Sequence, residues 1–392
     1  MLARLSLYYF AYFSFIGVFM PYFALYLDHR GLSGGEIGMV MALMQVMRLL
    51  APNLWGWLAD RSGQSLMVLR LAALISSLGF AALVAGNGLF AIAACVTVMS
   101  FFWTAQSPLA EALTLDLLRE RQGGYGRVRG WRSAGFVCAV LLMGFWLEQA
   151  SLEHIYHGGL LCLLAIFACA WLLPSPRLSV CSNATPPAPL REILLRPEVW
   201  KLLLACLLMT GAHGAFNVFY SMHLVDAGHS KTVIGALWTL GVLAEIAMFQ
   251  WAPSLMRRYS VTGMLRFALC VAVIRFALIG WTADSLVLLL LAQLAHGITF
   301  GLTHIVAVSA ISQYFGEGQA SRGQAVYGSV AYGAGGILGS LVSGWVWQAA
   351  GGAWAFTACA VLAGVGVLVV VTKPGRPQWW RSSSSETASN SR

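Results

Sequence analysis

Long apolar runs alternate with short polar segments along the whole chain. A membrane-crossing helix needs about 20 mainly apolar residues, and the runs bounded by glycine, proline, asparagine or charge supply enough length for twelve such helices. The expected spans are 4–27, 36–59, 66–86, 88–116, 128–149, 155–173, 200–224, 232–252, 262–282, 285–314, 323–348 and 352–372. The pattern predicts an all-α membrane protein with twelve transmembrane helices.

A polar segment rich in proline and serine separates the first six spans from the last six. We therefore expect an N-terminal six-helix bundle at 1–173, a cytoplasmic linker at 174–199 and a C-terminal six-helix bundle at 200–372. The polar residues 373–392 are expected to form a disordered cytoplasmic tail.

An internal repeat supports this division. Shifting the chain by 197 residues places residues 27–33 over residues 224–230, with leucine, glycine and serine matched at three positions. The same shift places Ile37 and Gly38 on an identical pair, Ile234 and Gly235, without a gap. The two halves are therefore expected to be pseudo-symmetric bundles arranged as a parallel repeat.

Composition and charge agree with a membrane protein. Only 10% of residues are charged and 59% are hydrophobic, whereas a soluble domain carries roughly 25% charged residues. The net charge of +9 would suit a nucleic-acid partner, but 20 of the 24 Lys and Arg fall on the side of the membrane that holds the N-terminus in this arrangement of spans. Basic residues concentrate on the cytoplasmic side, so both termini are expected in the cytoplasm and no nucleic-acid partner is expected.

A few ionisable side chains fall in the middle of spans, where each costs about 2.5–3.5 kcal/mol on insertion scales and should face a cavity or a partner. Arg48, Glu245 and Arg275 are the clearest examples. Because Arg48 and Glu245 are related by the repeat shift, we expect them to face one central cavity at similar depth.

A second charged set surrounds the loop between spans 4 and 5. Glu111 and Arg129 each lie about nine residues from an expected loop centre near residue 120, so at about 1.5 Å per residue they reach similar depth on neighbouring helices. We expect them to form an ion pair that either contacts the substrate in the cavity or braces the two helices. Asp116, Arg127 and Arg132 are expected to be loop-facing charges.

Histidines and carboxylates within the spans are candidates for proton transfer. His213 and Asn217 are spaced i, i+4 on one face of span 7, and His296 lies in span 10 with His304 eight residues further on. We expect Glu245, His296 or His213 to carry a coupling proton, and Arg48 or Arg275 to contact the substrate together with Asn217. A hydrogen-bonded packing role is the alternative for each histidine.

The chain resembles the major facilitator superfamily over residues 1–372. Gly56, Asp60, Arg61 and Gly63 match the signature of the loop between spans 2 and 3, which the resemblance implies to be a conformational loop. This sequence departs from the family signature after the second glycine, where Gln and Ser at 64–65 replace the usual basic pair.

Two narrower resemblances follow. Residues 125–129 resemble the segment of lactose-permease-like symporters whose last arginine pairs with a span 4 carboxylate, and Arg275 and His296 match that group's span 9 arginine and span 10 histidine. Thr299 stands where lactose permease has its proton-carrying glutamate. The segments 47–50, 108–113, 237–245 and 324–327 resemble the phenylpropionate permease branch.

These resemblances imply proton-coupled import of a small aromatic carboxylate such as 3-phenylpropionate. The alternatives are a proton-coupled sugar or nucleoside symporter and, more distantly, a non-transporting membrane sensor or a membrane enzyme, although no HExxH motif occurs. The eight cysteines show no metal-ligand spacing, so we expect no metal and no cofactor. We expect a monomer in a bacterial-type inner membrane whose partners are the substrate, protons and the lipid bilayer.

Overall fold

The computed structural model describes residues 2–118, 124–174, 190–316 and 319–371, and within them it contains helices and no strand. Twelve helices or helix pairs are long and apolar enough to cross a membrane. Each begins and ends within about six residues of its expected bounds. The prediction of twelve transmembrane helices is confirmed.

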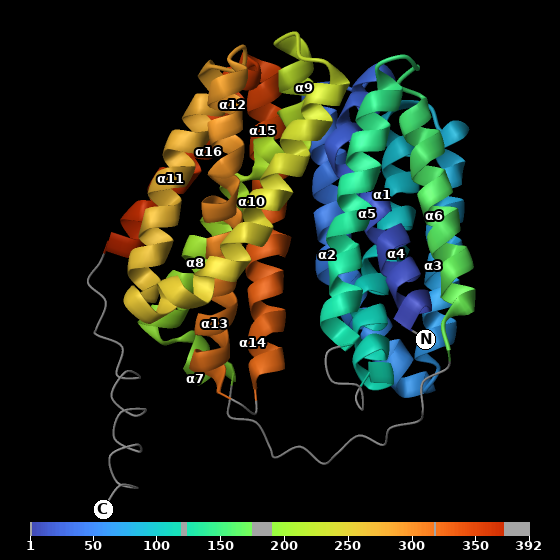
Figure 1. The fold of residues 1–392 in the computed structure, drawn as a ribbon, viewed down its shortest axis with the longest axis horizontal. Helices are drawn as coiled ribbons and strands as arrows, with labels where there is room; N and C mark the ends of the chain where they lie inside the picture. Colours follow the sequence, from blue (N-terminus) through green and yellow to red (C-terminus); the bar gives the residue numbers. More distant parts are fainter. Residues whose placement is uncertain (1, 119–123, 175–189, 317–318, 372–392) are drawn as a thin grey trace, which may run out of the picture.

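Figure 1 shows two bundles side by side, one from each half of the chain. The first six spans form one bundle. Its helices are α1 (Leu2–His29), α2 (Gly34–Ser62), α3 (Ser65–Ala81, continued by η1, Ala82–Val84), α4 (Gly88–Leu118), α5 (Gly124–Leu147) and α6 (His154–Leu172). The expected tail 373–392 and most of the linker 174–199 lie outside the described residues.

The C-terminal bundle is less regular than the sequence pattern predicts. Its seventh, tenth and eleventh spans are each divided, and the latter two contain π-helical turns, η2 and η3. Its elements are α7 (Leu190–Leu194), α8 (Pro197–Ala212), α9 (Gly214–Asp226), α10 (Lys231–Arg258), α11 (Val261–Trp281), α12 (Leu286–Leu294), η2 (Gly297–Leu302), α13 (Thr303–Phe315), α14 (Ala320–Tyr327), η3 (Gly328–Gly335), α15 (Gly336–Ala350) and α16 (Gly352–Val371).

The repeat is visible in the backbone of the turn that leads into the second helix of each bundle. Gly31 and Gly228 both adopt a left-handed conformation, with φ of 81° and 87°, which a residue with a side chain rarely adopts. Two residues later, Ser33 and Ser230 each accept a hydrogen bond from a backbone N–H of the helix they precede. Equivalent residues therefore start equivalent helices.

The two bundles touch each other at one end of the molecule. At Gly38 in α2, a Cβ atom would lie 2.6 Å from the Ser340 carbonyl oxygen of α15, so only glycine permits this approach. At the equivalent Gly235 in α10, a Cβ atom would lie 3.0 Å from the Val140 carbonyl oxygen of α5. The backbone N–H of Gly35 also donates to the Gln348 side chain across this interface, at 2.9 Å.

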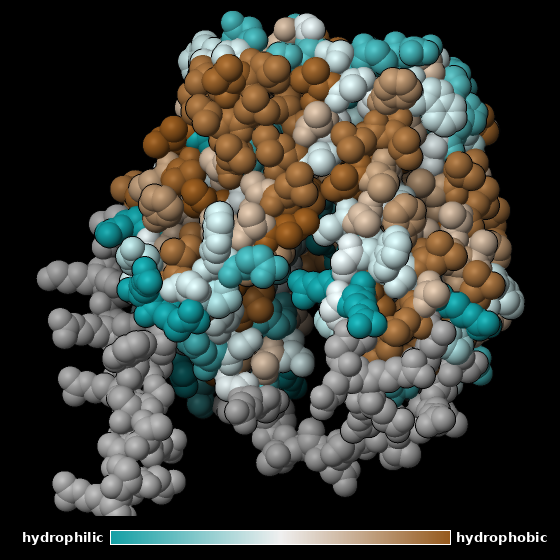
Figure 2. Space-filling model, viewed as in Figure 1, coloured by the Kyte–Doolittle hydropathy of each residue, from teal (hydrophilic) through white to brown (hydrophobic). Residues whose placement is uncertain are grey.

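The outer surface suits lipid. Figure 2 shows hydrophobic side chains across the middle of the visible face, with hydrophilic ones gathered toward the two ends. Many large apolar side chains, including Phe90, Leu142 and Trp345, are exposed. The chain is a multi-pass membrane protein, because only a bilayer would cover such a surface.

Candidate functional site

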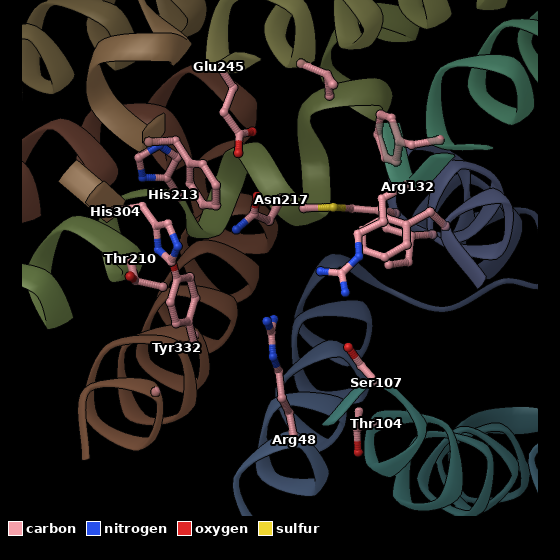
Figure 3. Close-up of a pocket in the computed structure, with 18 of the residues that line it drawn as sticks. Arg48, Thr104, Ser107, Arg132, Thr210, His213, Asn217, Glu245, His304 and Tyr332 are labelled. Atoms are coloured by element: carbon pink, nitrogen blue, oxygen red, sulfur yellow. The ribbon is translucent and has the colours of Figure 1, made fainter. Parts of the chain in front are cut away.

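A central cavity of about 1020 Å³ lies between the two bundles. We call the end where the two bundles touch, at Gly38 and Gly235, the closed end. The cavity extends away from it, toward the C-terminal halves of α2 and α10 and the first turns of α5, where residues such as Asn53, Gly126 and Gln250 border it. Residues of both bundles line it, as Figure 3 shows. The fold thus places a large, partly polar space at the middle of the membrane span.

The described lining carries more positive than negative charge. Arg48 from α2 and Arg129 and Arg132 from α5 lie on it, whereas Glu245 from α10 is the acidic residue among the described lining residues. Charges of one sign inside a low-dielectric cleft favour a ligand of the opposite sign. This lining therefore suits an anion.

Arg48 and Glu245, which the repeat relates, both line the cavity from opposite bundles. Figure 3 shows the Arg48 side chain pointing into the centre of the space, between Tyr332 and Ser107. Its guanidinium carbon lies 5.2 Å from the centre of the Tyr332 ring. No ion pair to Arg48 exists in the part of the chain that the structure describes, so its charge is available to a ligand.

The expected pairing of Glu111 with Arg129 is wrong. Glu111 pairs with Arg132, and Tyr125 also donates a hydrogen bond to this carboxylate. Arg129 and Arg132 lie three residues, or less than one helical turn, apart on α5, so the depth estimated from the sequence could not distinguish which of them pairs with Glu111. Arg132 is therefore not a loop-facing charge, while Arg129 lines the cavity without an ion pair among the described residues.

Removing one partner of this pair should destabilise the N-terminal bundle more than removing Arg129. Because the two side chains are partly buried, Glu111→Gln or Arg132→Gln leaves a charge without its partner. We expect the unfolding midpoint in detergent to fall by a few degrees, with a smaller fall for Arg129→Gln. In a double-mutant cycle the two losses should be non-additive. Equal losses for Arg129→Gln and Arg132→Gln would contradict the assignment.

The break in the seventh span lies at His213, between α8 and α9. His213 and Asn217 both line the cavity. The backbone N–H of Asn217 donates to the His213 carbonyl oxygen at 2.8 Å, so helical hydrogen bonding resumes directly after the break. Figure 3 shows Asn217 directed into the space between Glu245 and Arg48.

A column of stacked rings runs along the tenth span where η2 widens the helix. His296 and Phe300 lie 5.3 Å apart at an interplanar angle of 11°, and Phe300 and His304 lie 6.4 Å apart at 8°. His304 Nδ1 is 2.9 Å from the hydroxyl of Tyr332, which lies in η3. Because π-helical turns occur often at functional sites, these two adjoining turns mark the wall that a flat ligand would meet.

Tyr332 and the polar lining residues Ser107 and Thr210 were not among the residues predicted from the sequence. They carry no charge and belong to otherwise apolar spans, so hydropathy gave no signal for them. The runs of glycine in η2 and η3 (Gly297, Gly301, Gly328, Gly333 and Gly335) would have been a usable sign, because helices interrupted by glycine are typical of transporter sites.

Arg275 and the residues expected to form a conformational loop are not themselves among the lining residues. Arg275 is buried within the C-terminal bundle. Gly56, Arg61 and Gly63 belong to the end of α2, where Gly63 closes the helix with φ of 65°. The Arg61 guanidinium lies over the ring of Trp57 at 5.4 Å, and the side chain of Asp60 is outside the described part of the structure.

The sequence and the fold both match known transporters. The profile of the MFS_1 like family matches residues 2–358. A probable 3-phenylpropionic acid transporter of Escherichia coli (strain K12) is 28% identical over 353 residues, which cover 88% of this chain and 90% of that protein. A maltose permease of Geobacillus stearothermophilus is 28% identical over 376 residues, which cover 94% of each.

Two solved structures share the architecture. The nucleoside transporter NupG superposes with a TM-score of 0.78 at 18% identity, covering 94% of this chain and 97% of that one. A bacterial homologue of the lysosomal transporter Spinster, in an inward-facing and unoccupied conformation, gives a TM-score of 0.73 at 14% identity, covering 94% and 95%. The chain belongs to the MFS_1 like family and is a membrane transporter of the major facilitator superfamily.

Proposed function

We propose that this transporter imports a small aromatic carboxylate, such as 3-phenylpropionate, together with protons. The observation that carries the proposal is Arg48, a guanidinium that points into the middle of the cavity with no ion pair among the described residues. A carboxylate would supply its counter-ion. The stacked rings of His296, Phe300 and His304 offer a flat apolar wall for the ring of the same molecule.

Transport would follow alternating access, with the two bundles rocking about the central site. The basic side of the chain is assigned to the cytoplasm of a bacterial inner membrane, which places both termini inside. The bundles touch at the opposite end, through Gly38 and Gly235. In this orientation the conformation described here is open to the cytoplasm.

Uptake into inverted and right-side-out membrane vesicles tests the substrate and its coupling. Labelled 3-phenylpropionate should accumulate in right-side-out vesicles when a proton gradient is imposed. Glu245→Gln should abolish this accumulation and leave exchange of internal for external substrate in place, because the lining would lose the carboxylate proposed to carry the proton. Gradient-driven accumulation by Glu245→Gln at the wild-type level would remove Glu245 from the mechanism.

A second candidate function is proton-coupled transport of a sugar or nucleoside. The similarity to a maltose permease over 94% of the chain favours it, as do the neutral polar groups on the lining, Asn217 and Thr210. Maltose and a nucleoside therefore belong in the same uptake panel. Accumulation of either, with none of the aromatic acid, would replace the first proposal by the second.

A further inference from the structure

A buried polar cluster lies in the C-terminal bundle behind the wall of the cavity. Its centre is Arg275 in the middle of α11, which is 1% exposed. Phe216, Trp238 and His296 belong to the cavity lining, whereas Arg275 does not. The guanidinium carbon lies 4.3 Å from the centre of the Phe216 ring. His213 and Thr299, which lie within hydrogen-bond distance of this guanidinium, also line the cavity, so Arg275 lies directly behind the cavity wall.

The recorded partners of Arg275 are all neutral. Its Nε donates to the Ala292 carbonyl oxygen at 2.8 Å and its Nη1 to Thr299 Oγ1 at 3.2 Å. Nη1 also lies 3.4 Å from His213 Nε2, while His213 Nδ1 lies 2.8 Å from the Met209 carbonyl oxygen. Because a carbonyl oxygen only accepts, Nδ1 carries the proton of His213 and Nε2 is the acceptor. No carboxylate pairs with Arg275 within the described ranges.

Several polar atoms around this charge have no hydrogen-bond partner in the described part of the chain. They are Arg275 Nη2, both amide atoms of Gln293, the Tyr220 hydroxyl and His296 Nδ1. Gln293 and Tyr220 are 0% exposed. Buried polar groups are normally bonded. Gln293 Oε1 can only accept, but Arg275 Nη2, Gln293 Nε2 and the Tyr220 hydroxyl can donate, so these three donors indicate a missing acceptor.

These groups are close to one another. A Cβ atom at Gly241 would lie 2.9 Å from Gln293 Oε1 and 3.4 Å from His296 Cδ2, so both side chains border the same point of α10. The Phe216 ring lies 4.8 Å from the Tyr220 ring and 4.3 Å from the Arg275 guanidinium carbon. Gln293 directly follows Ala292, whose carbonyl oxygen accepts from Arg275. The donors therefore converge on one region between α9, α10, α11 and α12.

We propose that Arg275, Gln293 and Tyr220 bind a small monovalent anion inside the C-terminal bundle. Arginine keeps its charge in proteins, and a cation–π contact contributes only about 2 kcal/mol when desolvated, less than the several kcal/mol that burying an unpaired ion costs. An anion supplies both the counter-charge and an acceptor for the unpaired donors.

Two sources share this chemistry: a free halide such as chloride, and the carboxylate of a transported acid. The burial of Arg275, Gln293 and Tyr220 favours the halide, because a single ion needs less space among them than an acid with a ring attached. The carboxylate source rests on the proposed function, whereas the halide source does not.

Thermal unfolding of the purified transporter in detergent tests the site. The unfolding midpoint is measured while sodium chloride replaces sodium gluconate at constant ionic strength. We expect a saturable rise with chloride in the wild type, and none in Arg275→Gln. The matched control is Arg258→Gln, which replaces an exposed arginine at the end of α10 and should keep the rise. A midpoint that does not depend on chloride would overturn the halide source.

The same assay in gluconate with added 3-phenylpropionate distinguishes the carboxylate source. A rise that Arg275→Gln abolishes would assign the site to the substrate, and no rise with either anion would overturn the anion site altogether. Failure of vesicle uptake of 3-phenylpropionate leaves the chloride result unaffected, so the two proposals fail separately.

Two milder variants keep the test valid if Arg275→Gln does not fold. Tyr220→Phe and Gln293→Leu each remove one donor to the anion, which should weaken half-saturation by chloride about 10-fold or more, since a hydrogen bond to a charged group contributes about 1.5–3 kcal/mol. Crystals grown with bromide should show an anomalous peak beside Arg275 Nη2. Unchanged half-saturation in both variants would contradict the proposed donors.

Discussion

Arg48→Gln is expected to reduce uptake of 3-phenylpropionate by about 30-fold or more. Removing one partner of a desolvated charge pair costs about 2–5 kcal/mol, and 2 kcal/mol corresponds to about 30-fold in binding. Initial uptake rates in vesicles, measured over a range of substrate concentrations, should show the loss as a higher KM. Arg48→Lys should recover part of it, because the ammonium keeps the charge but lacks the planar fork of donors.

Two controls separate recognition of the carboxylate from a structural effect. Arg266→Gln removes an exposed arginine of α11 and should leave uptake and expression unchanged. The neutral amide of 3-phenylpropionate should compete for uptake equally well in wild type and Arg48→Gln. If Arg48→Gln transports the acid at the wild-type rate, Arg48 does not bind the carboxylate.

Gly38→Leu is expected to prevent α2 and α15 from meeting at the closed end and to lower transport at least 10-fold. A Cβ atom at Gly38 would already lie 2.6 Å from the Ser340 carbonyl oxygen and 2.7 Å from Gly344 Cα, and backbone atoms in a helix cannot move aside cheaply. The variant should therefore populate a conformation in which α2 and α15 are apart at this end. Binding of substrate should persist, because Gly38 does not line the cavity.

Accessibility of the cavity reports the trapped conformation directly. A cysteine introduced at Met44, which lines the cavity, should react faster with a membrane-impermeant thiol reagent from the closed side in Gly38→Leu than in wild type. Gly364→Leu is the matched control, since the nearest atom to a Cβ there is 3.9 Å away. Normal transport by Gly38→Leu would show that this contact does not limit the cycle.

Hydropathy was sufficient to predict the twelve spans because the bilayer sets a length that each apolar run must meet. The repeat shift also placed Arg48 and Glu245 at related positions, and both line the cavity. Such depth arguments depend on where each loop is centred. Between α4 and α5 the estimate assigned Arg129, in place of Arg132 less than one turn away, to Glu111.

Side-chain orientation behind the lining could not be predicted from the sequence. Arg275 falls at mid-span, as Arg48 does, yet it is turned into its own bundle while Arg48 faces the cavity. A single sequence gives the depth of such a residue, but its direction depends on how neighbouring helices pack. The break at His213 was hidden for a related reason, because an apolar run continues on both sides of it.

The wide turns η2 and η3 change the direction in which the side chains of the following helices point. One additional residue in a turn rotates every later side chain by about 100° relative to an unbroken α-helix. His304 lies two residues after the end of η2, and Tyr332 lies within η3. The direction in which these two rings point therefore depends on the number of residues in the π-helical turns as well as on which residues they are. In this part of the chain, insertions and deletions would change the lining as strongly as substitutions do.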